Sequence, residues 1–167
     1  MLIDVTCKAP YNRQRKRFYH RAAAETWVPF VSSLAQRWIA VGALFGALSV
    51  ALGAYGAHGL ADFLKSSGYA GDDLSRRVDI YNTAIHYQML HAVALVVTGL
   101  ALEQRASAWW RFAGWAFLTG ILVFSGLLKV LAFAGPQWNW LGAIVPFGGV
   151  SMIAGWTALA IGALRKA

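Results

Sequence analysis

Four long apolar runs alternate with polar segments along this chain of 167 residues. At a rise of about 1.5 Å per residue, a run of about 23 residues forms a helix of about 34 Å. That length matches the hydrocarbon core of a bilayer, which is roughly 30 Å thick. The pattern therefore predicts an all-α integral membrane four-helix bundle. The predicted spans cover residues 38–60, 80–102, 110–133 and 141–164.

Composition supports a membrane protein over a soluble one. Hydrophobic residues make up 58% of the chain and charged residues only 13%, whereas a soluble domain has about 25% charged residues. So few charges cannot cover a water-facing surface. We therefore expect the lipid bilayer to be the main surrounding of residues 37–167, the predicted transmembrane domain.

The segments outside the spans differ in character. Residues 1–36 form a basic N-terminal tail. Three interpretations of it remain open: a disordered segment, an interfacial helix, or a start assigned too early, with the protein beginning closer to Arg37. Residues 61–79 are predicted to be a loop, within which Leu64, Tyr69 and Leu74 are placed to anchor a short surface helix. Pro146 is expected to kink the first turns of the fourth span, because proline removes a backbone donor.

Lysine and arginine are distributed unevenly between the two predicted sides. The N-terminal segment, the second loop and the C-terminus together carry eleven, whereas the first and third loops carry three. Positive loops stay in the cytoplasm, so both termini are predicted to be cytoplasmic. The basic tail is then an orientation signal and a contact for anionic lipid, and a nucleic-acid partner is not expected.

Small residues recur along one side of the first span. Steps of three and four residues place them on a single helix stripe. In lipid, such a stripe allows a neighbouring helix to approach closely, so we interpret it as a helix-packing surface. The stripe consists of Gly42, Gly46, Ser49, Gly53 and Gly56.

Polar residues interrupt the apolar pattern in the half of the bundle remote from the termini. Polar and ionisable groups within a span are costly and deserve a functional hypothesis. The candidate polar cluster consists of His58, Asn82, His86, Tyr87, Gln88, His91 and Lys129. For Lys129, the alternative is an anchor that reaches the interface and pairs with Asp62, Asp79 or a helix C-terminal carbonyl.

Helix geometry limits what the histidines can do together. At about 100° per residue, His86 and His91 point about 140° apart, so they cannot ligate one ion from a regular helix. A haem would need one histidine from each of two helices, such as His58 and His86. The simpler interpretation is that each imidazole forms hydrogen bonds between helices. No metal site and no catalytic residue are predicted, and no bound cofactor is expected.

Several sequence segments together resemble one small membrane protein family. They are GALFGALSVALGAYGAHGL, YNTAIHYQMLHAVALVVTGL, FLTGILVFSGLLKVLAF and LGAIVPFGGVSMIAGW. They are similar to the YgdD-like family, also called domain of unknown function 423, over residues 37–164. The resemblance implies a four-helix protein of the bacterial inner membrane, but no activity. The positions that carry it are Gly56, His58, Gly59, Asn82, His86, Tyr87, His91 and Lys129.

Three functional hypotheses remain open from the sequence. The first is a non-enzymatic accessory, assembly or structural subunit of the cytoplasmic membrane, with a membrane-protein partner or a second copy of itself. The second is a haem- or quinone-linked protein of electron or proton transfer. The third is a small oligomeric transporter or channel. Small-residue packing and the absence of catalytic motifs favour the first.

Overall fold

The computed structural model describes residues 33–165, and every regular element in this range is helical. Four helical segments are long and apolar enough to cross a membrane: Ser33–His58, Gly71–Gln104, Ala108–Phe133 and Pro136–Leu164. The prediction of an all-α protein with four spans is therefore confirmed. The predictions for the tail up to residue 32 lie outside the described residues.

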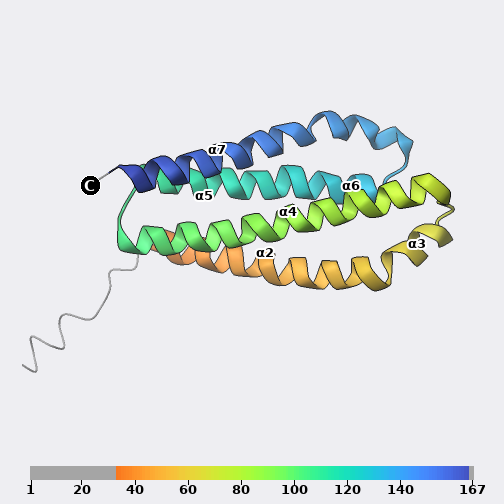
Figure 1. The fold of residues 1–167 in the computed structure, drawn as a ribbon, viewed down its shortest axis with the longest axis horizontal. Helices are drawn as coiled ribbons and strands as arrows, with labels where there is room; N and C mark the ends of the chain where they lie inside the picture. The colour runs from red at the N-terminus through yellow and green to blue at the C-terminus, as the bar shows by residue number, and fades with distance from the viewer. Residues whose placement is uncertain (1–32, 166–167) are drawn as a thin grey trace, which may run out of the picture. The chain divides into compact units, whose positions relative to one another are not determined.

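The four spans form two helical hairpins that pack through α4 (Figure 1). Helix α4 packs against α2 on one side and against the third span on the other, and α7 packs against the third span. A π-helical segment, η1, interrupts the third span, and a 3₁₀ segment, η2, opens the fourth. The elements are α2 (Ser33–His58), α3 (Leu60–Ser66), α4 (Gly71–Gln104), α5 (Ala108–Gly120), η1 (Ile121–Ser125), α6 (Gly126–Phe133), η2 (Pro136–Ala143) and α7 (Val145–Leu164).

The first two helices extend further than the predicted spans. Helix α2 begins at Ser33, so residues 33–36 belong to the first helix rather than to the tail. Helix α4 begins at Gly71, so the prediction of a loop throughout residues 61–79 was wrong. Its first two turns are polar because they lie beyond the apolar run, where apolar length gives no signal. The connection that remains includes Gly68, whose φ of +92° favours glycine.

A short helix does lie in this connection, as the apolar residues there suggested. Leu64 of α3 is completely buried, and Tyr69 and Leu74 pack against the same cluster. Tyr81 of α4 also belongs to this cluster, and its hydroxyl donates to the Leu52 carbonyl of α2 at 2.9 Å. These contacts fix α3 across the end of the α2–α4 hairpin.

The fourth span changes helix type immediately before Pro146. The 3₁₀ segment η2 ends at Ala143, and Pro146 lies in the first turn of α7. The first backbone N–H groups of a helix have no partner within the helix. Proline therefore starts α7 at little cost.

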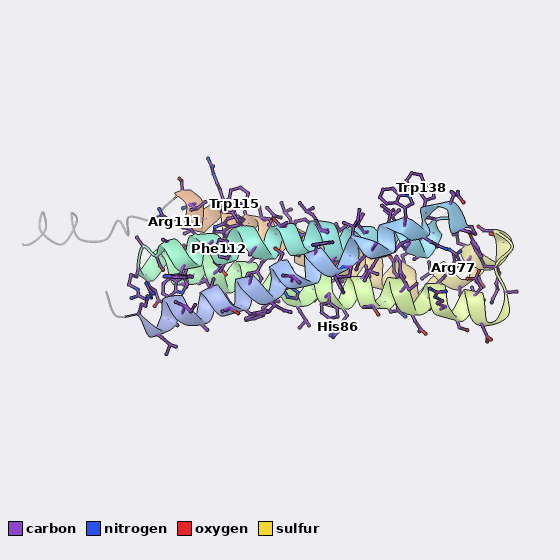
Figure 2. The ribbon with its side chains drawn as sticks, turned by 90° about the horizontal axis from the view of Figure 1, so that it is seen from above. Arg77, His86, Arg111, Phe112, Trp115 and Trp138 are labelled. Carbon is purple, nitrogen blue, oxygen red and sulfur yellow. The ribbon has the colours of Figure 1, made fainter. Side chains whose placement is uncertain are left out.

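The outward faces of the spans are apolar. Leu44, Leu122, Phe147 and Ile153 are all more than half exposed, which would be unfavourable in water and is favourable in lipid. Trp115 and Trp138 lie toward opposite ends of the helices (Figure 2). Tryptophan is enriched at both membrane interfaces, so their positions agree with a helix bundle that spans the bilayer.

Candidate functional site

A polar contact joins three helices around Gln88. The Gln88 side chain is completely buried in α4. Its Nε2 donates to the Phe45 carbonyl of α2 at 3.3 Å, and its Oε1 accepts a hydrogen bond from Lys129 Nζ of α6. Ser49 Oγ donates to the same Phe45 carbonyl at 2.8 Å. Gln88 therefore links the two hairpins.

Lys129 has a different partner from those considered in the sequence. It contacts Gln88 rather than Asp62, whose carboxylate pairs with the exposed Lys65 at 3.3 Å. Among residues 33–165, Lys129 forms no ion pair. A half-buried ammonium group is thus held by a neutral amide, because the long lysine side chain can reach α4 across the helix interface.

His91 uses both of its ring nitrogens. Trp156 Nε1 of α7 lies 3.2 Å from His91 Nε2, and His91 Nδ1 lies 2.8 Å from the Tyr87 carbonyl. An indole N–H can only donate, so Nε2 accepts and Nδ1 carries the proton that is donated to Tyr87. This contact pattern assigns the Nδ1–H tautomer and connects α4 directly to α7.

Aromatic rings surround the His91 imidazole. Tyr87 stacks on it with an interplanar angle of 7° and a centroid distance of 6.1 Å. The rings of Phe117 and Trp156 lie 5.7 Å and 6.2 Å from it. Aromatic pairs at such distances stabilise their contact beyond simple burial. His91 is therefore part of a packed aromatic core.

The remaining members of the predicted cluster lie on the surface. His58, Asn82 and His86 are exposed, and Tyr87 is 40% exposed although one face of its ring covers His91. Figure 2 shows His86 pointing away from the bundle. The structure thus brings Gln88 together with Lys129, places His91 in the aromatic core, and leaves these polar side chains facing outward.

These placements do not favour the haem hypothesis. That hypothesis needs two imidazoles that face each other between helices. His91 already uses both nitrogens, and His58 and His86 are exposed. Within residues 33–165, no group of three or more His, Cys, Asp or Glu side chains is arranged to hold a metal ion.

The small-residue stripe of α2 faces α4 over most of its length. Gly42 and Ser49 are buried, and Gly42 lies against the backbone of Ala92. Gly53 and Gly56 lie beside α4 side chains, Ile85 and Tyr81 respectively. Gly46 differs, because no atom of a neighbouring helix lies near it.

Sequence reasoning missed two buried polar atoms that have no hydrogen-bond partner among the described residues. Ser125 Oγ and Trp38 Nε1 form no hydrogen bond to any described residue. Ser125 lies in η1, one turn before Lys129, and is completely buried. A π segment inside an α-helix is frequently found at functional sites. Nothing in the local sequence distinguishes this segment from regular helix.

Two arginines that tie helix ends together were also missed. Arg77 of α4 donates through Nη1 to the carbonyls of Ala132 and Ala134 at 3.1 and 2.9 Å, and through Nε to Asp73 at 3.2 Å. Arg105, just after α4, donates to the Gly162 carbonyl of α7. Both guanidinium groups satisfy carbonyls at the C-terminal end of a helix. The sequence signal that could have indicated these contacts is the presence of an arginine near each end of a long helix.

Comparison with known proteins assigns the family. The family model described as "Protein of unknown function (DUF423)" matches residues 52–149, which is more than half of the chain. The chain belongs to the DUF423 family. All seven residues of the predicted polar cluster fall inside the matched range of this DUF423 protein. The resemblance inferred from the sequence is thereby confirmed.

Bacterial relatives extend the match. This DUF423 protein is 40% identical to a UPF0382 membrane protein of Staphylococcus epidermidis over 78% of this chain and 97% of that one. It is 36% identical to UPF0382 membrane protein YwdK of Bacillus subtilis, over 77% of this chain and 96% of that one. It is 33% identical to UPF0382 inner membrane protein YgdD of Escherichia coli, over 74% of this chain and 86% of that one. No solved structure matches the chain.

These relatives and the four apolar helices agree on location. This DUF423 protein is a multi-pass protein of the bacterial cytoplasmic membrane. The names of the relatives state no activity, substrate or partner.

Proposed function

We propose that this protein is a non-enzymatic accessory, assembly or structural subunit that packs against another protein in the cytoplasmic membrane. The observation that carries the proposal is the pairing of the polar groups within the spans. Gln88, Lys129 and His91 all bind groups of neighbouring helices. Polar bonds between transmembrane helices hold the helices in one arrangement, which is what a rigid scaffold requires.

Helix α2 supplies the surface on which we place the partner. It is the least enclosed of the four spans. In its apolar stretch of 18 residues, 11% is buried by the rest of the protein, against 28–44% in the corresponding stretches of the other three spans. The face turned away from α4 carries several small side chains beside the exposed Leu44 and Leu48, and small side chains allow close approach of another helix. The exposed alanines of this face are Ala40, Ala43, Ala47, Ala51 and Ala54.

The test is co-purification after gentle detergent extraction from native membranes. The wild-type chain should retain a distinct membrane protein in constant proportion. Ala47→Phe in α2 should reduce that retention at least severalfold, because the phenyl ring would separate the two helices. Ala160→Phe, an equally bulky change on the exposed face of α7, is the matched control and should leave retention unchanged. A chain that purifies alone from native membranes would contradict the proposal.

The proposal also includes an orientation with both termini in the cytoplasm. It is supported by the eleven lysines and arginines assigned to one side against three assigned to the other. The α2 partner surface does not depend on this orientation.

The contact between Gln88 and Lys129 favours a second candidate, a small oligomeric transporter or channel. An ammonium group paired only with an amide inside a membrane is a typical feature of ion or substrate pathways. Flux measured in proteoliposomes should then fall in Lys129→Met and Gln88→Leu variants. Flux of inorganic ions that equals that of empty liposomes would eliminate this candidate.

A further inference from the structure

Two shallow hollows lie side by side at the α3 end of α4 and share Arg76 and Ile80. One, of about 360 Å³, lies between α4, the end of α6 and η2, and has Arg77 and Asn139 in its wall. The other, of about 420 Å³, runs along α4 and has Asp72 and Asp79 in its wall. Helical spacing places Asp72, Arg76 and Asp79 on one stripe of α4.

Three charged side chains of this stripe form no ion pair with another described residue. Arg77 is already paired with Asp73, and three carbonyls near the end of α6 accept from it. In contrast, Arg76, Asp72 and Asp79 are exposed, and within residues 33–165 none of them forms an ion pair. The hollows therefore present one guanidinium group flanked by two carboxylates.

The position of the hollows corresponds to the headgroup region of the bilayer. They lie at the end of the bundle that carries Trp138, near Arg77 (Figure 2). Trp138 and Trp140, the sequence neighbours of Asn139, are exposed, and tryptophan concentrates at the level of lipid headgroups. Each hollow is bordered on the third span by a leucine, Leu128 or Leu131. The charged side chains of the hollows thus adjoin an apolar surface on the third span.

We propose that the two hollows bind one phospholipid with a phosphoethanolamine headgroup. Its phosphate lies on Arg76, its primary ammonium group lies on Asp72, one turn closer to the end of the bundle, and an acyl chain follows Ile80 and the leucines of the third span. A guanidinium group recognises phosphate oxygens well, and an ammonium group supplies donors for carboxylates. An anionic lipid fits less well, because its headgroup offers no cation to the carboxylates beside Arg76.

The experiment measures lipid binding by the purified full-length chain. Dioleoyl phosphatidylethanolamine, phosphatidylglycerol and phosphatidylcholine are titrated separately into the protein in detergent, and bound lipid is counted by native mass spectrometry. Phosphatidylethanolamine should bind tightest. Arg76→Gln should weaken its binding roughly fivefold, the effect of losing one cation near a lipid phosphate. Arg111→Gln, an exposed arginine toward the other end of the bundle (Figure 2), is the matched control and should bind as the wild type.

The carboxylates require a separate variant. Asp72→Asn should remove the preference for phosphatidylethanolamine over phosphatidylcholine, whereas Asp62→Asn, an exposed acid outside both hollows, should keep it. Equal binding of phosphatidylglycerol, or unchanged binding in both Arg76→Gln and Asp72→Asn, would overturn the proposal. Full competition by glycerophosphoethanolamine, which lacks acyl chains, would point to a soluble ligand and also overturn the lipid assignment.

Discussion

Two glycines of the same α2 stripe should respond in opposite ways to alanine. A Cβ atom added at Gly42 would lie 2.6 Å from the Ala92 carbonyl oxygen and 2.9 Å from the Val96 nitrogen of α4. A Cβ atom added at Gly46, one turn further on, meets no atom within 4 Å. Because backbone atoms cannot rotate away, Gly42→Ala must push α2 from α4.

The magnitude follows from the two distances. Ordinary carbon contacts begin near 3.4 Å, so α2 would have to move by about 0.8 Å. Overpacking costs roughly 1–3 kcal/mol, and a clash with backbone belongs at the upper end. Alanine offsets about 1 kcal/mol of this cost, because its helix propensity is higher than that of glycine. The net loss for Gly42→Ala is therefore about 2 kcal/mol, and Gly46→Ala should gain up to about 1 kcal/mol.

The assay is thermal unfolding of the purified variants in detergent, monitored by circular dichroism. For a chain of this size, about 1 kcal/mol shifts the midpoint by roughly 2–4 °C. Gly42→Ala should therefore unfold about 4–8 °C below the wild type. Because both sites lie inside the same helix, the difference between the two variants cancels the propensity contribution and isolates the contact with α4. A difference below about 0.5 kcal/mol would refute the reasoning.

Three further predictions concern the polar bonds and the orientation. Gln88→Leu and Lys129→Met should each lower the unfolding free energy by about 1–3 kcal/mol, because each leaves a hydrogen-bond partner unsatisfied. The double variant should lose about 1 kcal/mol less than the sum of the two single losses. Strictly additive losses would contradict the contact between the two side chains. Arg77→Lys should lower the unfolding free energy by about 1–3 kcal/mol, since an ammonium group cannot reach both Asp73 and the α6 carbonyls. The control variant Arg76→Lys should change it by no more than about 0.5 kcal/mol. Equal losses in the two variants would argue against the stabilising contacts of Arg77. A fluorescent protein fused to the C-terminus should fluoresce in cells and a phosphatase fused there should be inactive, and the reverse would place the C-terminus outside.

The number and the approximate positions of the membrane spans were predictable, because they depend on lipid as the solvent. A run of apolar residues long enough to cross the hydrocarbon core has to be helical, because a helix satisfies its own backbone groups. The four spans could therefore be derived from apolar length, and the family from the resemblance of particular sequence segments. The start of α4 could not, because its polar first turns lie outside the lipid and carry no apolar pattern.

The candidate site was predicted by residue type and not by contact. A glutamine and a lysine within apolar runs were recognisable as unusual, but the partners considered for Lys129 were Asp62, Asp79 or a helix C-terminal carbonyl, and not Gln88. Its actual partner is 41 positions away in the sequence, and only the register of α6 against α4 brings them together. The π segment at Ser125 shifts that register, and its sequence is as apolar as regular helix.

The sequence by itself determined that this chain lies in a membrane and crosses it four times, because hydropathy and length are local properties. Tertiary structure decided which polar groups are shared between helices and which face outward. His86 and His91 illustrate the division: both are imidazoles of the same helix, yet one is exposed and the other is bonded to Trp156 of α7. The difference arises because a helix presents each residue in one direction, and only the packing of its neighbours decides what that direction meets.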